Sequence, residues 1–391
     1  KFVDHYEGLQ VIMAINNIGL QAKRKISDVF LDRGVVVKIL PPVDKWVNGE
    51  FALNQIHNVK IEDLLGREEI QMNNKQISQE INSKSVLVTG AAGSIGSEIV
   101  RQLIAYFPAK IILVDQSESG LFDLEYELSS LMPSNTELVV KIADVTDRNR
   151  LSAIFKAHKP AFVFHAAAYK HVPLMEKNPY EAVKVNILGT QILADLSAEH
   201  GVEKFVMVST DKAVNPTNVM GATKRFAEMY TQSLNVSEGV GTKFIATRFG
   251  NVLGSSGSVI PLFKKQIERG GPVTVTHPDI TRYFMTIPEA VELVIQAGNM
   301  ALGGEVFVLD MGDPVKITDL AQKMIYLSGF TLKNSENPNG DIEIKFTGLR
   351  PGEKLYEELL IGDNPVPTEH QRIMKANEKF IALNELKPRL E

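Results

Sequence analysis

The chain has 391 residues, enough for two or three domains with cores of their own. Its formal net charge of −5 lacks the basic excess of a nucleic-acid binder. Without cysteine it can form no disulfide, thiolate nucleophile or cysteine-ligated metal site, and no apolar run is long enough to cross a membrane. We therefore expect no metal, no nucleic-acid partner and no membrane contact by this chain.

The first seventy residues have an α/β pattern. Runs of strand type at 9–15 and 35–40 flank a segment of helical spacing, 16–34, that stops at Gly34. Because two strands and a helix cannot cover both faces of a sheet, residues 1–70 are expected to be the truncated remnant of an N-terminal domain, in a chain cut from a longer protein. After the break at Pro41-Pro42, polar residues 71–84 are expected to form a linker or a linker helix.

A regular alternation of strands and helices begins at Ser85. The predicted strands are 85–89, 110–114, 137–142, 161–165, 204–209 and 243–248. The predicted helices are 96–107, 147–157, 186–200 and 222–233. The alternation predicts a doubly wound parallel sheet of Rossmann type over 85–250. Residues 251–391, with a helix at 288–301, are expected to form mainly a smaller substrate domain at the carboxyl ends of the strands.

The first strand of this domain runs directly into a glycine-rich turn that opens a helix. Glycines let the backbone approach a pyrophosphate, whose charge then meets the exposed amides of the helix. Asp115, at the end of the next strand, would accept hydrogen bonds from a ribose and repel a 2′-phosphate, which predicts NAD rather than NADP. An ordinary turn or cap role is the alternative for Asp115, and likewise for Asp144. The expected cofactor contacts are Gly90, Gly93, Ser94, Ile95, Gly96, Asp115, Asp144, Val145, Ala166 and Ala167.

The GxxGxxG spacing, together with His165-Ala-Ala-Ala168 and Asn186-Ile-Leu-Gly-Thr190, resembles the extended short-chain dehydrogenase/reductase superfamily over about residues 84–375. That superfamily normally places a tyrosine four residues before a lysine, on one helix face. Here Lys224 is present but the tyrosine position holds Met220, whose thioether cannot act as a base.

Two interpretations follow from the missing tyrosine. Either the protein has lost catalysis and only senses NAD, or the acid–base work has moved to other residues. Asp211 and Lys212 favour the second, because two ionisable residues just past a strand's carboxyl end are costly unless they are used. An ordinary loop ion pair is the alternative for them.

Thr210-Asp211-Lys212 with Met220 and Lys224 resembles the membrane-associated nucleotide-sugar 4,6-dehydratases of bacterial capsule, O-antigen and protein-glycan synthesis. The same pattern appears at 63–67, 93–98, 165–176, 248–254, 281–285 and 350–354. The resemblance implies NAD-dependent conversion of UDP-N-acetylglucosamine to a 4-keto-6-deoxy sugar, with retention at C5. We also expect a homo-oligomer (a dimer or larger) and a parent protein anchored at the cytoplasmic side of the bacterial inner membrane.

The resemblance also implies a role for each site residue. Asp211 would be the acid at C6 and Lys212 the base at C5, while Thr210 positions or relays the proton of the C4 hydroxyl and Lys224 holds the nicotinamide ribose. The expected substrate contacts are Lys170, His171, Asn251, Arg282, Arg350 and Glu353. Arginine forks suit a diphosphate because they donate in pairs. The alternatives are a nucleotide-sugar 4-epimerase, disfavoured because most such enzymes keep the tyrosine, and an inactive NAD-binding regulator.

Overall fold

The computed structural model describes residues 9–15, 19–31, 33, 35–40, 57–59, 61, 64, 74–360, 365–386 and 388. Gly34, Pro41, Pro42 and all but Leu64 of the 63–67 segment lie outside these ranges. The chain forms two compact units, each assembled from separate stretches. Unit 1 contains residues 1–69, 251–286 and 313–349, and unit 2 contains 70–250, 287–312 and 350–391.

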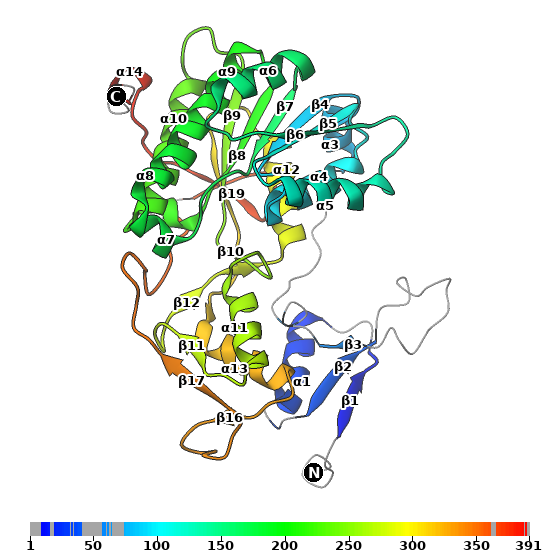
Figure 1. Cartoon of the computed structure of the whole chain (residues 1–391), viewed down its shortest axis with the longest axis vertical. Coiled ribbons are helices and arrows are strands. Elements are labelled where there is room, and N and C mark those ends of the chain that lie inside the picture. The colour runs from blue at the N-terminus through cyan, green and yellow to red at the C-terminus, as the bar shows by residue number, and fades with distance from the viewer. Residues whose placement is uncertain are drawn as a thin grey trace. The chain divides into compact units, whose positions relative to one another are not determined.

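Unit 2 is built on a nine-stranded sheet in the order β18-β19-β14-β9-β8-β7-β4-β5-β6 (Figure 1). Its strands are β4 (Ser85–Thr89), β5 (Lys110–Asp115), β6 (Glu137–Ile142), β7 (Phe162–His165), β8 (Lys204–Val208), β9 (Lys243–Arg248), β14 (Val306–Leu309), β18 (Val366–Pro367) and β19 (Ile373–Ala376). The seven strands from β14 to β6 are parallel, whereas β19 and β18 add an antiparallel edge. The predicted doubly wound parallel sheet is confirmed.

The strand order reverses beside β4, which begins this sheet. β4 pairs with β5 on one side and with β7 on the other, so that Thr89 lies opposite both Val114 and His165. Ligands of open parallel sheets bind at such a switch point, outside the carboxyl ends of the strands. The topology therefore fixes where the site of unit 2 should be sought.

Helices cover the sheet in two groups. The main helices are α3 (Asn74–Ile81), α4 (Ser94–Ile104), α5 (Glu118–Ser129), α6 (Arg148–His158), α9 (Thr190–Glu199), α10 (Val219–Asn235) and α12 (Ile287–Met300). α6, α9 and α10 enclose one apolar core with the strands, and α12 packs against α3, α4 and β8. The predicted helix at 186–200 is split, because a π-helical segment, Val183–Gly189, precedes α9.

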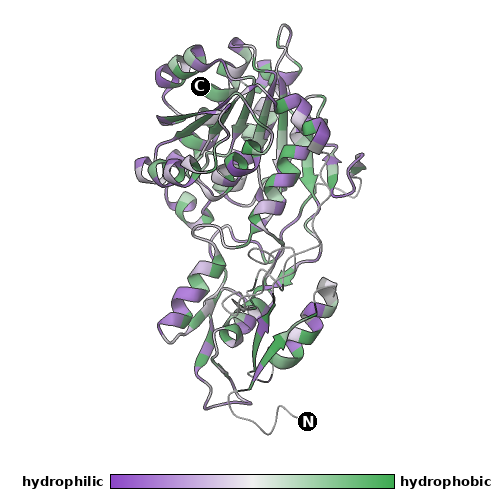
Figure 2. Ribbon diagram, turned by 90° about the vertical axis from the view of Figure 1, so that its right-hand side faces the viewer, coloured by the Kyte–Doolittle hydropathy of each residue, from purple (hydrophilic) through white to green (hydrophobic). Residues whose placement is uncertain are grey.

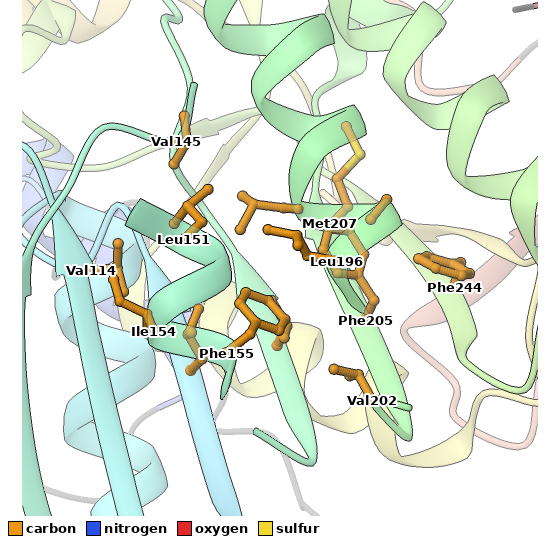
Figure 3. Close-up of a cluster of buried hydrophobic side chains, with 14 of the residues drawn as sticks. Val114, Val145, Leu151, Ile154, Phe155, Leu196, Val202, Phe205, Met207 and Phe244 are labelled. Carbon is orange, nitrogen blue, oxygen red and sulfur yellow. The ribbon is translucent and has the colours of Figure 1, made fainter. Parts of the chain in front are cut away.

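The core on the α6–α9–α10 side explains the uninterrupted apolar runs of the strands. Phe155, Phe205 and Phe244 are fully buried in it, and Figure 3 shows them between the sheet and the helices. Strands that are buried on both faces do not show the alternation of apolar and polar residues that is typical of half-exposed strands. In Figure 2 the strands are accordingly mostly green, while the helices carry both colours.

Unit 1 joins the N-terminal residues to part of the C-terminal third. Its elements are β1 (Gln10–Met13), α1 (Leu20–Leu31), β2 (Val36–Ile39), β3 (His57–Asn58), β10 (Asn251–Val252), α11 (Val259–Glu268), β11 (Val273–Val275), β12 (Thr281–Arg282), β13 (Phe284–Met285), β15 (Val315–Lys316), α13 (Ile317–Leu327), β16 (Leu332–Lys333) and β17 (Ile342–Phe346). Tyr326 and Leu327 of α13 pack on the core formed by Met13, Leu31 and Val37. The described part of the N-terminal segment therefore shares a unit with later residues, because α13 covers its apolar side chains; its origin as the remnant of a longer domain stays a prediction.

The structure also corrects the predicted domain at 251–391. Residues 287–312 and 350–391 belong to unit 2, because β14 and β19 extend its sheet and α12 packs on its helices. In the predicted linker, α3 buries Ile77 and Ile81. Within the described ranges, no helix has the length and apolarity needed to span a bilayer.

A buried ion network joins β9, α10 and the chain beyond β19. The Arg248 guanidinium donates to Glu228 at 2.7 and 2.6 Å and also reaches Glu378. Burial alone would raise the pKa of Glu228, but Arg248 and the hydroxyl of Ser209 hold that pKa below its usual value. The network therefore depends on complete pairing of its charges.

We predict that Glu228→Gln destabilises the protein by about 3 kcal/mol, because Arg248 loses one of its two buried carboxylates. Glu127→Gln is the matched control, since its pair with Arg101 is half-exposed and should contribute below about 1 kcal/mol. Urea unfolding measures both. Equal effects of the two substitutions would contradict the importance of the buried network.

Candidate functional site

The glycine-rich turn after β4 forms a close-packed cradle. Gly90 has a φ of +67°, and a Cβ placed there would lie 2.6 Å from the backbone nitrogen of Ala167. A Cβ on Gly96 would lie 2.1 Å from the carbonyl oxygen of Gly90. Gly93 precedes α4 and supplies no side-chain cap, and the amino end of a helix carries the partial positive charge that attracts an anion.

Asp115 fixes this turn from the end of β5. Its carboxylate accepts hydrogen bonds from the amides of Ala92 (3.0 Å) and Ser117 (2.9 Å). Asp144 accepts from the amide and the hydroxyl of Thr146 in a local turn. Among the described residues, neither of these carboxylates has an ion-pair partner within hydrogen-bond range. Both can therefore accept hydrogen bonds from a ligand that carries hydroxyl groups.

These elements enclose one pocket in unit 2. It is lined by Gly90, Gly93, Asp115, Gln116, Ala143, Asp144, Val145, Ala166, Ala167, Ala168, Tyr169 and Val185. Seven of the ten residues expected at the cofactor from the turn and strand ends line this pocket. Ser94 and Ile95 begin α4, and Gly96 lies beneath the turn. The pocket occupies the switch point between β4 and its neighbours, with small or acidic residues facing it.

His165 and Asn186 hold segments next to the pocket in place, and we predicted no individual role for either of them. The His165 ring bridges the hydroxyls of Thr89 (2.7 Å) and Thr190 (3.0 Å), and burial with nearby Lys224 lowers its pKa to about 3. Asn186 makes two hydrogen bonds to the backbone of Tyr169. The loop beyond β7, which carries Lys170 and His171, therefore leaves the sheet in a fixed direction.

The predicted catalytic segment, 210–212, follows β8. Asp211 forms a short 3₁₀ turn with Lys212, and its amide donates to the carbonyl of Phe249 at 3.1 Å. Lys212 Nζ lies 2.9 Å from Asp211 Oδ1, which also accepts from the hydroxyl of Thr210 at 2.8 Å. Asp211 Oδ2 is buried and has no hydrogen-bond partner. A buried carboxylate oxygen left unpaired is costly, which marks it as a group kept for a ligand or a reaction.

Helix α10 starts directly against this turn. Asn218 caps its first turn, and a Cβ on Gly221 would lie 2.1 Å from the carbonyl oxygen of Lys212, so only glycine permits the contact. Met220 is 2% exposed and packs with Met175 and Ala182. The residue at the tyrosine position therefore fills an apolar cluster.

Lys224 is buried one turn after Met220. Burial lowers its pKa to about 8, although the charge of Glu228 opposes that shift. A lysine with a lowered pKa inside a parallel α/β unit suits a hydrogen-bonding or charge-sensing role near a ligand.

A loop from the C-terminal part of unit 2 contacts the chain that follows Lys212. The carbonyl of Gly352 accepts from Asn218 at 3.1 Å, and Lys354 Nζ donates to the carbonyl of Val214 at 3.0 Å. Glu357 lies 3.9 Å from Lys212 Nζ. We did not predict Glu357, and no local sequence signal places it beside a residue 145 positions earlier.

The expected substrate residues fall in both units. Arg350 and Glu353 belong to this loop of unit 2, where the Glu353 carboxylate accepts from the amide of Arg350 and closes a turn. Asn251 and Arg282 lie in unit 1. Their assignment to the substrate stays a prediction.

We predict that Gly96→Ala weakens both folding and NAD binding, although alanine normally favours a helix over glycine. The new methyl group would lie 2.1 Å from the carbonyl oxygen of Gly90, so the turn must move, at a cost of about 1–3 kcal/mol. Gly241→Ala is the control, because no atom lies within 4 Å of its Cβ position. Thermal melting and NAD titration measure the effect; an unchanged Gly96→Ala protein would contradict the cradle.

A family model described as "Polysaccharide biosynthesis protein" matches residues 86–378. The capsular polysaccharide biosynthesis protein CapD of Staphylococcus aureus is 54% identical over 92% of the chain, which spans only 59% of that relative. A UDP-N-acetylglucosamine 4,6-dehydratase (inverting) of Campylobacter jejuni is 37% identical over 72% of the chain and 79% of its own length. A UDP-glucose 4-epimerase of Rickettsia rickettsii is 34% identical, over 74% of the chain and 81% of its own length.

Proposed function

The chain belongs to the polysaccharide biosynthesis protein family, and we propose that it dehydrates a UDP-sugar, UDP-N-acetylglucosamine, to a 4-keto-6-deoxy sugar with NAD as resident cofactor. The observation that carries the proposal is the pair formed by the buried Asp211 and the partly buried Lys212, with one carboxylate oxygen of Asp211 left unpaired. An elimination needs an acid and a base on adjacent carbons, and this pair offers both.

The pocket at the switch point fits NAD. The cradle of Gly90 and Gly96 leaves no room for a Cβ, and the amino end of α4, which has no side-chain cap, suits the pyrophosphate. Asp115 would accept from the ribose hydroxyls and repel a 2′-phosphate, which favours NAD over NADP. Lys224 would donate to the nicotinamide ribose. Bound NAD would supply the hydride chemistry, namely hydride acceptance from C4 of the sugar and hydride return to C6.

The residues of the chain would move the protons. The 4-ketone acidifies the C5 proton, so that Lys212 can remove it as a modest base, while Asp211 protonates the departing C6 hydroxyl. Thr210, which donates to Asp211 at 2.8 Å, is placed to position the C4 hydroxyl or to relay its proton. Met220 takes no part in proton transfer and leaves the site of the usual tyrosine apolar.

The nucleotide sugar would be held by the charged and polar residues that the resemblance assigns to the substrate. We assign Arg350 to the diphosphate because a guanidinium fork donates in pairs. Lys170, His171, Glu353, Asn251 and Arg282 complete the proposed substrate set. We also propose retention at C5, a homo-oligomeric assembly and a parent protein at the cytoplasmic side of the bacterial inner membrane.

Two other functions remain as outcomes of the test. The similarity to a UDP-glucose 4-epimerase favours epimerisation as the second candidate, but the methionine at the tyrosine position opposes it. The buried ionisable pair opposes an inactive NAD-binding regulator, which would gain nothing from it.

We predict that UDP-N-acetylglucosamine is converted to its 4-keto-6-deoxy product without net NADH, because hydride leaves and returns within one site. In heavy water, solvent deuterium should appear at C5, and a substrate deuterated at C4 should deliver deuterium to C6. NMR and mass analysis of the product measure both labels. Stoichiometric NADH would indicate an ordinary dehydrogenase, and a C4 epimer would indicate an epimerase.

We predict that Asp211→Asn and Lys212→Ala each lower kcat by about 10²–10⁴-fold, the usual contribution of a positioned acid or base. Sugar-nucleotide binding should survive, since neither side chain is assigned to the nucleotide. Glu137→Gln is the control, because it alters an exposed ion pair with Lys110.

Met220→Tyr should not raise activity. If Met220→Tyr created activity in an otherwise inert protein, the inactive-regulator interpretation would be correct.

A further inference from the structure

Lys212 lies between two buried carboxylates from distant parts of the chain. Its Nζ is 2.9 Å from Asp211 Oδ1 and 3.9 Å from Glu357 Oε1. The side chains of Asp211 and Glu357 are 0% and 4% exposed, and that of Lys212 is 17% exposed. Charges this far from solvent interact much more strongly than surface pairs.

The position of Glu357 is set by the loop that carries it. Gly352 and Lys354 bond to the segment that follows Lys212, and a Cβ on Gly352 would lie 2.7 Å from the Cβ of Asn218. Asn215 also donates to Glu358 at 2.8 Å. Hydrogen bonds therefore hold the loop on both sides of Glu357. The fold itself places the Glu357 carboxylate beside Lys212.

The other charged groups on the elements packed against this turn are engaged elsewhere. On α10, Arg225 pairs with Glu228 and Glu378, and Lys224 has Glu228 as its charged neighbour. On the loop, Lys354 bonds to a carbonyl and Glu358 to Asn215. Asp211 and Glu357 are thus the carboxylates within 4 Å of the Lys212 ammonium among the described residues.

The proposed elimination changes the charge of both members of the Asp211–Lys212 pair. The C5–H bond breaks and its proton goes to the neutral amine of Lys212, while the electron pair forms the C5–C6 double bond. The C6–O bond breaks, and the hydroxyl takes the proton of Asp211 and leaves as water. Before this step Asp211 is neutral, so the ionised carboxylate that faces Lys212 is that of Glu357.

We propose that Glu357 is a positioning residue for this reaction: its carboxylate holds Lys212 at the sugar and stabilises the ammonium that forms when Lys212 takes the C5 proton. The inference rests on the proposed dehydration. Stabilisation of a charge that develops only during the reaction lowers the barrier without tightening substrate binding. The role thus predicts an effect on kcat rather than on KM.

The test compares Glu357→Gln with Glu358→Gln in the NAD-loaded full chain. Both remove one carboxylate from the same loop, but Glu358 is 53% exposed and pairs with Lys354, not Lys212. Glu357→Gln should lower kcat about tenfold or more with little change in KM. The limb of the pH–rate profile that reports Lys212 should move to lower pH, because an ammonium with one carboxylate fewer loses its proton more readily. Glu357→Asp should recover part of the activity.

A second readout does not depend on turnover. NMR of isotopically labelled lysine side chains, with the Lys212 signal identified by its absence from Lys212→Ala, follows the titration of Lys212 directly. Its midpoint should fall by about one pH unit or more in Glu357→Gln and stay unchanged in Glu358→Gln. An unchanged midpoint in Glu357→Gln, or an equal fall in both variants, would overturn the role of Glu357. If the midpoint falls but wild-type protein forms no 4-keto product, the ion pair stands and the proposed dehydration fails.

Discussion

The buried carboxylate of Glu228 is the interaction on which the arrangement of β8, β9 and α10 in unit 2 depends. It accepts from Arg248 at the end of β9 and from Ser209 at the end of β8, and it sits on the same helix as Lys224, one turn further on. One fully buried anion thereby fixes two strand ends and the helix beside them. Because a buried charge is tolerated only when it is fully paired, these three elements have little freedom to separate.

Two kinds of site follow the carboxyl ends of strands of this sheet. The close-packed turn at Gly90 and Gly96, after β4, borders a pocket that Asp115 also lines. Beyond β8, the buried carboxylate of Asp211 pairs with the partly buried Lys212. In the proposed reaction the first would bind a cofactor and the second would move protons, so that the reaction would need no tyrosine at the position of Met220.

The two units are interleaved along the sequence, since stretches of one unit separate stretches of the other. Strand β14 and helix α12 return to unit 2 after a stretch that belongs to unit 1, and α13 covers apolar residues contributed by the first forty. In both cases a segment covers an apolar face that would otherwise be exposed. Burial of apolar surface lowers the free energy of the folded state whatever the position of the covering segment in the sequence.

The sequence by itself determined the parallel sheet, the glycine turn and the place of Asp211 and Lys212 just past the end of a strand, because each is encoded within a few residues: apolar runs, a fixed glycine spacing and adjacent charges. Only the tertiary structure decided that residues 251–391 divide between two units, that Met220 joins an apolar cluster, and that Glu357 faces Lys212. These features depend on contacts between residues far apart in the chain, and a single sequence has no local pattern that specifies which distant side chain will fill a given space.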